Sequence, residues 1–131
     1  MGDTAALLRA NAAFYDAFAS HDIESMDELW ARGVDLVCIH PGWPPLYGRE
    51  EVMESWRSIL LGGEAPQIVC DEPRAASFGE TGLVTCYERI GDQVLVASNA
   101  FLRQNGVWQL VHHQAGPLST ELEPEVERTL N

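Results

Sequence analysis

The histidine that precedes a proline near the middle of the chain is the side chain best placed for acid–base chemistry. His40 ends an apolar stretch, and the loop that follows it, residues 41–45, contains three prolines together with Gly42 and Trp43. An imidazole has an ordinary pKa of ~6.5, so it can act as a general base at neutral pH with little tuning. The alternative is a histidine that is simply hydrogen-bonded at the start of a loop, and the sequence leaves both interpretations open.

A second group of candidate residues comes from a hairpin predicted around Asn105-Gly106. An Asn-Gly pair between two apolar runs is a strong signal for a two-residue type I′ turn. That turn places Asn99 opposite His112, and the alternation of strands then puts six side chains on one face. They are Asn99, Phe101, Trp108, Leu110, His112 and Gln114. Such a mixture of aromatic and polar groups is typical of a ligand pocket, and a shift by one residue would exchange the two faces.

The other candidates lie on predicted helices and loops. Phe14 and Trp56 fall on amphipathic helices, where they form either a pocket wall or ordinary core. Trp43 either covers the mouth of a pocket or contacts another subunit, and Tyr15 either donates a hydrogen bond inward or packs in the core. Glu88, on a predicted middle strand, is either a buried acid or an outward charge.

Metal and cofactor chemistry receive little support from the spacing. His112 and His113 are adjacent, so on a strand they point to opposite faces, and His113 is expected on the outer face as an interface or surface residue. A metal would need His40 and His112 to converge, and no third ligand is placed to complete the site. The chain has no lysine, which excludes Schiff-base chemistry. We therefore expect no metal and no cofactor.

The elements that must position these residues follow an α+β order. Helices are expected from Asp3 or Thr4 with a stripe through Leu7, Asn11, Phe14 and Phe18, from Asp22 to Gly33, and over 48–61. Strands are expected over 34–39, 67–78, 82–90, 94–104 and 107–115. Three helices packed on the concave face of one curved, mostly antiparallel sheet would bury the apolar stripes and leave a pocket between the two layers.

Composition narrows the class of protein. The chain has 131 residues, which suits one domain, and its formal net charge of -12 makes nucleic acid and anionic membrane surfaces poor partners. Three widely spaced cysteines without a CxxC motif indicate buried free thiols in a reducing compartment. Neither a signal peptide nor an apolar run near the ~20 residues of a membrane span is present, so we expect a cytoplasmic protein.

Three segments of the chain resemble the NTF2-like superfamily, specifically its SnoaL-like and ketosteroid-isomerase-like members. His21-Asp22-Ile23-Glu24 is similar to the family's turn into the second helix. The run from Pro44 to Glu50 resembles the segment after the catalytic strand of ketosteroid isomerases. The run from Trp108 to Gly116 resembles the last strand of SnoaL-like proteins and of the association domain of calcium/calmodulin-dependent kinase II. The resemblance implies a cone-shaped NTF2-like domain over residues 1–117, followed by an acidic extension over 118–131.

The family's catalytic residues transfer to this chain only in part. The resemblance places His40 where isomerases carry their Asp base, and Asn99 near the protonated Asp that donates to the oxyanion. The oxyanion tyrosine falls near Phe14, which lacks a hydroxyl, while Tyr15 is ~100° further around the helix. A base and an amide donor remain while the phenol is lost, which argues against steroid isomerisation by the family mechanism.

Two functions remain open from the sequence. The first is a small-molecule pocket protein, and if it is an enzyme, a cofactor-free isomerase, cyclase or dehydratase that acts on an apolar carbonyl compound. The second is a non-catalytic dimerisation, assembly or ligand-sensing module that dimerises through the outer sheet face with Leu102, Val111 and His113. For the first, the predicted catalytic residues are His40, Asn99 and Tyr15, and the predicted substrate-binding residues are Phe14, Trp43, Trp56, Phe101, Trp108, His112 and Gln114.

Overall fold

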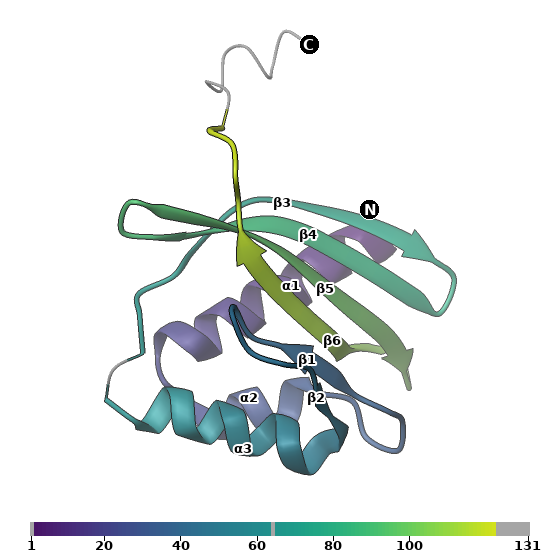
Figure 1. The fold of residues 1–131 in the computed structure, drawn as a ribbon. Coiled ribbons are helices and arrows are strands. Elements are labelled where there is room, and N and C mark those ends of the chain that lie inside the picture. The colour runs from purple at the N-terminus through teal and green to yellow at the C-terminus, as the bar shows by residue number, and fades with distance from the viewer. Residues whose placement is uncertain (1, 64, 123–131) are drawn as a thin grey trace, which may run out of the picture.

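The protein folds as three helices packed against one bent sheet, as expected for the α+β order (Figure 1). The computed structural model describes residues 2–63 and 65–122. The helices are α1 (Asp3–Ala19), α2 (Ile23–Leu29) and α3 (Gly48–Leu61). The strands are β1 (Val37–Ile39), β2 (Leu46–Tyr47), β3 (Val69–Phe78), β4 (Thr81–Ile90), β5 (Gln93–Gln104) and β6 (Val107–Pro117).

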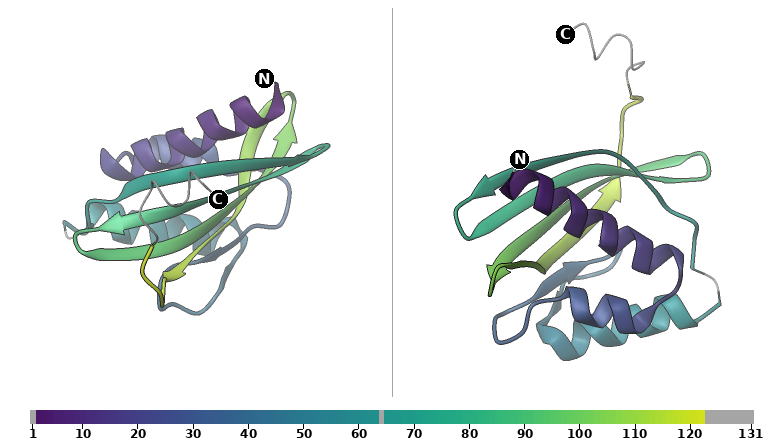
Figure 2. Two further views of the ribbon diagram at one scale, coloured as in Figure 1. Left: turned by 90° about the horizontal axis from the view of Figure 1, so that it is seen from above. Right: turned by 180° about the vertical axis from the view of Figure 1, so that it is seen from behind.

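The six strands form a single sheet with the order β2-β1-β6-β5-β4-β3. Strand β1 runs parallel to β6, and all other neighbouring strands are antiparallel. Figure 2 shows α1, in purple, lying across one face of the long strands, while α2 and α3 lie near the short strands β1 and β2. The predicted curved, mostly antiparallel sheet with helices on its concave face is therefore confirmed.

Most predicted boundaries agree with the structure because local signals set them. Asp22 caps α2 by accepting a hydrogen bond from the Ser25 backbone N–H at 3.1 Å. Asn105 and Gly106 both have positive φ (52° and 80°), as a type I′ turn requires. The first strand is shorter than the predicted 34–39, and β2 was not predicted, since two residues give no periodic signal.

The predicted register of the last hairpin holds only near its turn. Arg103 pairs with Trp108 and Phe101 with Leu110, as a two-residue turn requires. The register then shifts between Ala100 and Phe101, so Asn99 pairs with His113 instead of His112. This β-bulge inserts one residue into β6, and every β6 side chain beyond it changes face.

The α1 stripe is buried as predicted. Leu7, Asn11, Phe14 and Phe18 have at most 6% of their surface exposed. Gly82 on β4 allows the helix to approach closely, because a Cβ at this position would lie 2.5 Å from Cδ1 of Leu7. The absence of a side chain at this position is therefore a packing requirement.

Arg49 joins α3 to the end of α2. Its guanidinium donates to the backbone oxygens of Trp30 and Ala31, both at 3.0 Å, and to the backbone oxygen of Asp27. It also pairs with the Asp27 carboxylate at 2.9 Å. One side chain thus satisfies carbonyls at the helix end that have no intrahelical partner.

The division between residues 1–117 and an acidic extension stays a prediction. Strand β6 ends at Pro117, and most of the predicted extension, residues 123–131, lies outside the described residues.

Candidate functional site

An open, mostly apolar cavity lies between the helices and the sheet, with a volume of about 510 Å³. Its walls come from α1, α3, the loop after β1, the segment before β3, the β4–β5 hairpin and β6. Five aromatic side chains line it: Phe14, Tyr15, Phe18, Trp43 and Trp56. Three of its other lining side chains can accept hydrogen bonds and titrate: His40, Glu88 and His113.

His40 is held in one orientation by a serine of α3. Its Nε2 lies 2.8 Å from Oγ of Ser55, and that hydroxyl donates its hydrogen to the Val52 carbonyl at 2.7 Å. Because the hydroxyl hydrogen is already used, Nε2 must carry the proton and donate it to Ser55. The unprotonated Nδ1 has no hydrogen-bond partner in the described part of the chain. It is not among the fully buried polar atoms there, and His40 lines the cavity. The site therefore presents an imidazole lone pair to a bound molecule.

His113 is fixed in a similar way, by an amide behind the cavity wall. Its Nδ1 lies 2.6 Å from Oδ1 of Asn99. The Asn99 amide nitrogen donates to Oδ1 of Asn11 at 2.8 Å and to the Tyr15 hydroxyl at 3.3 Å, which leaves its oxygen as the acceptor. His113 therefore donates from Nδ1 and keeps its lone pair on Nε2.

Glu88 and Tyr15 form a buried acid–phenol pair. The Tyr15 hydroxyl donates to Oε2 of Glu88 at 2.6 Å, and only 2% of the Glu88 residue surface is exposed. The short distance is typical of a hydrogen bond to a charged oxygen. Since the hydroxyl also accepts from Asn99, a chain of hydrogen bonds connects Glu88 to His113 through Tyr15 and Asn99.

Burial shifts the pKa of each of these groups toward its neutral form. Desolvation lowers the pKa of His40 to about 4. Desolvation, with smaller contributions from the charges of His40 and His112, lowers the pKa of His113 to about 3. Desolvation also raises the pKa of Glu88, against the opposing effect of the Tyr15 hydrogen bond. Both imidazoles are thus neutral at physiological pH, so each keeps one unprotonated ring nitrogen.

The structure brings together five of the ten predicted site residues. His40, Tyr15, Phe14, Trp43 and Trp56 all line the cavity. Phe14 and Tyr15 both face inward because the buried stripe of α1 is wide: Tyr15 follows Asn11 by four residues and precedes Phe18 by three. The ring centroids of His40 and Trp56 are 4.7 Å apart with nearly perpendicular planes, so the candidate base packs directly against the wall.

The other five predicted residues do not line the cavity. Asn99 is fully buried behind it, and Phe101 and Trp108 are buried farther along the same inner face. His112 and Gln114 were placed on the wrong face, because the bulge turns them outward; His112 is bonded through Nδ1 to the Val37 carbonyl. His40 and His112 therefore do not converge, as a shared metal would require.

Two titratable lining residues, His113 and Glu88, were absent from the predicted site. His113 was expected on the outer face, and the bulge that turns it inward leaves no signal in the sequence. For Glu88, the sequence allowed either a buried acid or an outward-facing charge. The alternation of Val84, Cys86 and Glu88 on one strand face could have resolved this, since its two neighbours are strongly apolar.

A comparison with protein families agrees with this architecture. Residues 7–119 match the family model of the SnoaL-like domain. The chain belongs to the SnoaL-like family. The match covers all six strands, and it includes every lining residue from Phe14 to Pro117.

Solved structures extend the relationship of this SnoaL-like domain. It is 34% identical to a proposed dehydratase of the NTF2-like family from Streptomyces avermitilis, with a TM-score of 0.81 over 90% of this chain and 97% of that one. It is 30% identical to a proposed calcium/calmodulin-dependent protein kinase type II association domain from Thiobacillus denitrificans, with a TM-score of 0.71 over 84% and 93%. Both relatives support the NTF2-like assignment.

A plant protein shares the domain within a longer chain. F-box protein SKIP8 of Arabidopsis thaliana is 24% identical over 114 residues. The match covers 86% of this chain and 49% of SKIP8, so the chain spans about half the length of that relative. Within the described ranges 2–63 and 65–122, no helix is long and apolar enough to cross a membrane.

Proposed function

We propose that this SnoaL-like domain binds a small apolar carbonyl compound in its cavity and transfers a proton on it without a cofactor. The observation that supports this most directly is the orientation of His40. Ser55 holds its Nε2–H, which leaves the Nδ1 lone pair available in a cavity that is otherwise mostly apolar. A positioned base beside aromatic walls is the arrangement that general base catalysis needs.

Each group has a distinct role in this proposal. His40 removes a proton from the carbon next to the carbonyl group, and the Ser55 hydroxyl accepts a hydrogen bond from the resulting imidazolium. Tyr15 contributes its ring to the cavity wall, because its hydroxyl hydrogen is already donated to Glu88. Phe14, Trp43 and Trp56 enclose the apolar body of the substrate and reduce its contact with water.

Among the reactions that fit, we place dehydration first, because the Streptomyces relative is a proposed dehydratase. In this reaction His40 takes the proton from the carbon and a carbon–carbon double bond forms. The neighbouring hydroxyl group leaves and receives that proton, so the products are a conjugated carbonyl compound and water. Isomerisation and cyclisation start with the same proton removal and need the same base.

The test is a panel of β-hydroxy carbonyl compounds with apolar substituents, followed by the ultraviolet absorbance of the conjugated product. We expect His40→Ala to fold normally and to lose roughly 10²–10⁴-fold in turnover, the usual contribution of a general base. His112→Ala, which changes an imidazole outside the cavity, should leave turnover near that of the wild type. Equal activity of the wild type and His40→Ala would exclude His40 as the base.

A dimerisation or assembly module is the second candidate, and the outer face of the sheet favours it. Leu83 and Ala100 pair there across β4 and β5, as do Tyr87 and Val96, and all four are at least partly exposed. His113 does not belong to this face, as shown above, and Val111 packs against the core. The Thiobacillus relative, a proposed association domain, is consistent with a homodimer formed through this surface.

The oligomeric state distinguishes this candidate. We expect sedimentation analysis to show a dimer for the wild type and a monomer for Val96→Glu, because a charge on an apolar interface must lose its hydration. Val107→Glu provides a matched control at an exposed valine beside the β5–β6 turn. A monomeric wild type would remove the sheet dimer while leaving the cavity proposal in place.

A further inference from the structure

The three buried titratable side chains that line the cavity share one property: they accept hydrogen bonds, whereas the exposed Gln93 that also lines it can donate as well. His40 presents Nδ1, His113 presents Nε2, and Glu88 presents the carboxylate oxygen that Tyr15 does not occupy. The Tyr15 hydrogen is already donated to Glu88, and Nε1 of Trp56 is fully buried in the described part of the chain. A ligand complementary to these three groups must therefore donate hydrogen bonds.

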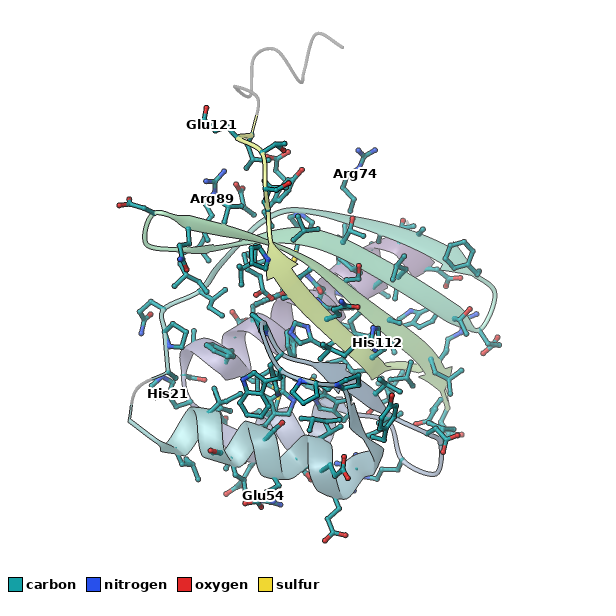
Figure 3. The ribbon with its side chains drawn as sticks, in the orientation of Figure 1. His21, Glu54, Arg74, Arg89, His112 and Glu121 are labelled. Carbon is teal, nitrogen blue, oxygen red and sulfur yellow. The ribbon has the colours of Figure 1, made fainter. Side chains whose placement is uncertain are left out.

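Glu88 also lacks a compensating positive charge. None of the cavity's lining residues is an arginine, and the chain contains no lysine. Arg89, the next residue on β4, pairs with Asp71 at 2.8 Å and points away from the helices (Figure 3). Within residues 2–63 and 65–122, no ion pair includes Glu88. A buried carboxylate without a cation is costly unless a ligand supplies one.

The surroundings of Glu88 suit a cation. Tyr15 contacts it directly, and Phe14 packs against Tyr15 with ring centroids 4.8 Å apart. The ring centroid of Trp56 lies 5.5 Å from that of Phe14. Aromatic rings attract cations through their negative faces, and this attraction is strongest at sites with little water.

We propose that the ligand of this cavity is an organic cation, a protonated amine on an apolar body, with its ammonium group beside Glu88. This inference rests on the proposed ligand-binding function and adds a charged group to the expected compound. The ammonium group provides the hydrogen-bond donors that Glu88 and the two imidazoles lack. A carboxylate-bearing compound is disfavoured beside Glu88, because it would meet the acceptors of Glu88 and the two imidazoles and a like charge.

The proposal fixes the direction of a pH effect. Burial raises the pKa of Glu88 in the empty cavity, so part of the population is protonated as the pH falls. An ammonium ion favours the ionised carboxylate, so it binds with release of a proton and its affinity rises with pH through this pKa. A neutral carbonyl compound that accepted a hydrogen bond from protonated Glu88 would show the opposite dependence.

Three probes with the same indole body test the proposal by isothermal titration calorimetry at high salt, where the net charge of the protein is screened. They are tryptamine (an ammonium), tryptophol (an alcohol) and indole acetate (a carboxylate). We expect tryptamine to bind about ten-fold or more tightly than tryptophol, and indole acetate to bind weakest. Tryptamine affinity should also increase from acidic to neutral pH.

Two variants identify the source of the preference. Glu88→Gln keeps an acceptor for Tyr15 and should abolish the tryptamine preference while tryptophol still binds. Glu54→Gln removes an exposed charge of α3, labelled in Figure 3, and should change nothing. If tryptophol binds as well as tryptamine, or Glu88→Gln retains the preference, the cation is excluded and the cavity remains a ligand site. If none of the probes binds, both the cation and the proposed ligand site lose their support.

Discussion

The side chains of His113 and Asn99, directly opposite each other on β6 and β5, form a 2.6 Å hydrogen bond behind the cavity wall. This hydrogen bond depends on the β-bulge in β6, because without the bulge His112 would occupy the inward position opposite Asn99. Asn99 uses its oxygen for His113 and its nitrogen for Asn11 and Tyr15. This single amide therefore fixes the orientation of an imidazole and a phenol that both line the cavity.

Replacing Asn99 with alanine should destabilise the fold strongly. The change removes the partner of the His113 Nδ1–H and of the Asn11 Oδ1 in a buried region, and each unsatisfied polar group costs about 1–3 kcal/mol. We expect the free energy of unfolding in urea to fall by about 2–4 kcal/mol. Ser98→Ala, at the adjacent and more exposed position of β5, should cost far less. Equal effects of the two substitutions would show that the network does not contribute.

The buried histidines predict a loss of stability in mild acid. Their folded pKa values of about 4 (His40) and about 3 (His113) lie below the ordinary ~6.5, so the unfolded chain binds protons first as the pH falls. Their stabilising effect is complete above pH ~6.5 and decreases toward the folded values, by up to about 1.4 kcal/mol per pH unit for each group. Urea unfolding at pH values on either side of this window measures the slope.

Glu88 should oppose this trend, because burial raises its pKa and the folded state then holds its proton more tightly than the unfolded chain. That contribution grows as the pH falls through the raised pKa. Glu88→Gln should therefore steepen the acid loss, whereas His113→Gln should reduce it. A slope that neither substitution changes would assign the acid sensitivity to other groups.

The guanidinium of Arg49 should be more important for stability than its partial exposure suggests. Lysine at this position cannot donate at once to the Trp30, Ala31 and Asp27 oxygens, because it lacks the planar fork of arginine. We expect Arg49→Lys to lower the free energy of unfolding by about 1–3 kcal/mol. Arg57→Lys, in an exposed pair with Glu54, is the matched control and should change it by less than about 0.5 kcal/mol.

The close contact between Gly82 and Leu7 predicts a coupled pair of substitutions. Gly82→Ala places a methyl group against the Leu7 side chain and should cost about 1–3 kcal/mol through overpacking. In a Leu7→Ala background the same change should cost much less, since the conflicting side chain is gone. A double-mutant cycle measured by thermal unfolding checks this; additive effects would contradict the steric explanation.

Several parts of the site could be predicted from short-range patterns. The spacing of Asn11, Phe14 and Phe18 identifies the buried face of α1, and the glycine at residue 48 marks the start of α3. His40 could be selected because it ends an apolar strand before a rigid loop. In each case the sequence pattern spans only a few turns of helix or a few residues of strand, so the prediction does not depend on contacts with distant parts of the chain.

Other parts depend on contacts between distant elements. The Ser55 bond that fixes the His40 tautomer joins the loop after β1 to α3, and the Tyr15 bond to Glu88 joins α1 to β4. Neither pairing has a sequence spacing that predicts it. The same is true of the absence of a cation near Glu88 among the described residues, which is evident only from the positions of the cavity's neighbours.

The sequence alone determined the order of helices and strands, the turn at Asn105-Gly106, and the family to which the chain belongs. Only the tertiary structure decided which histidine of the His112-His113 pair faces the cavity. The physical reason is that side chains alternate along a strand, so one inserted residue reverses the face of every position beyond it. The position of the bulge depends on packing across the whole sheet, so the local sequence does not predict it.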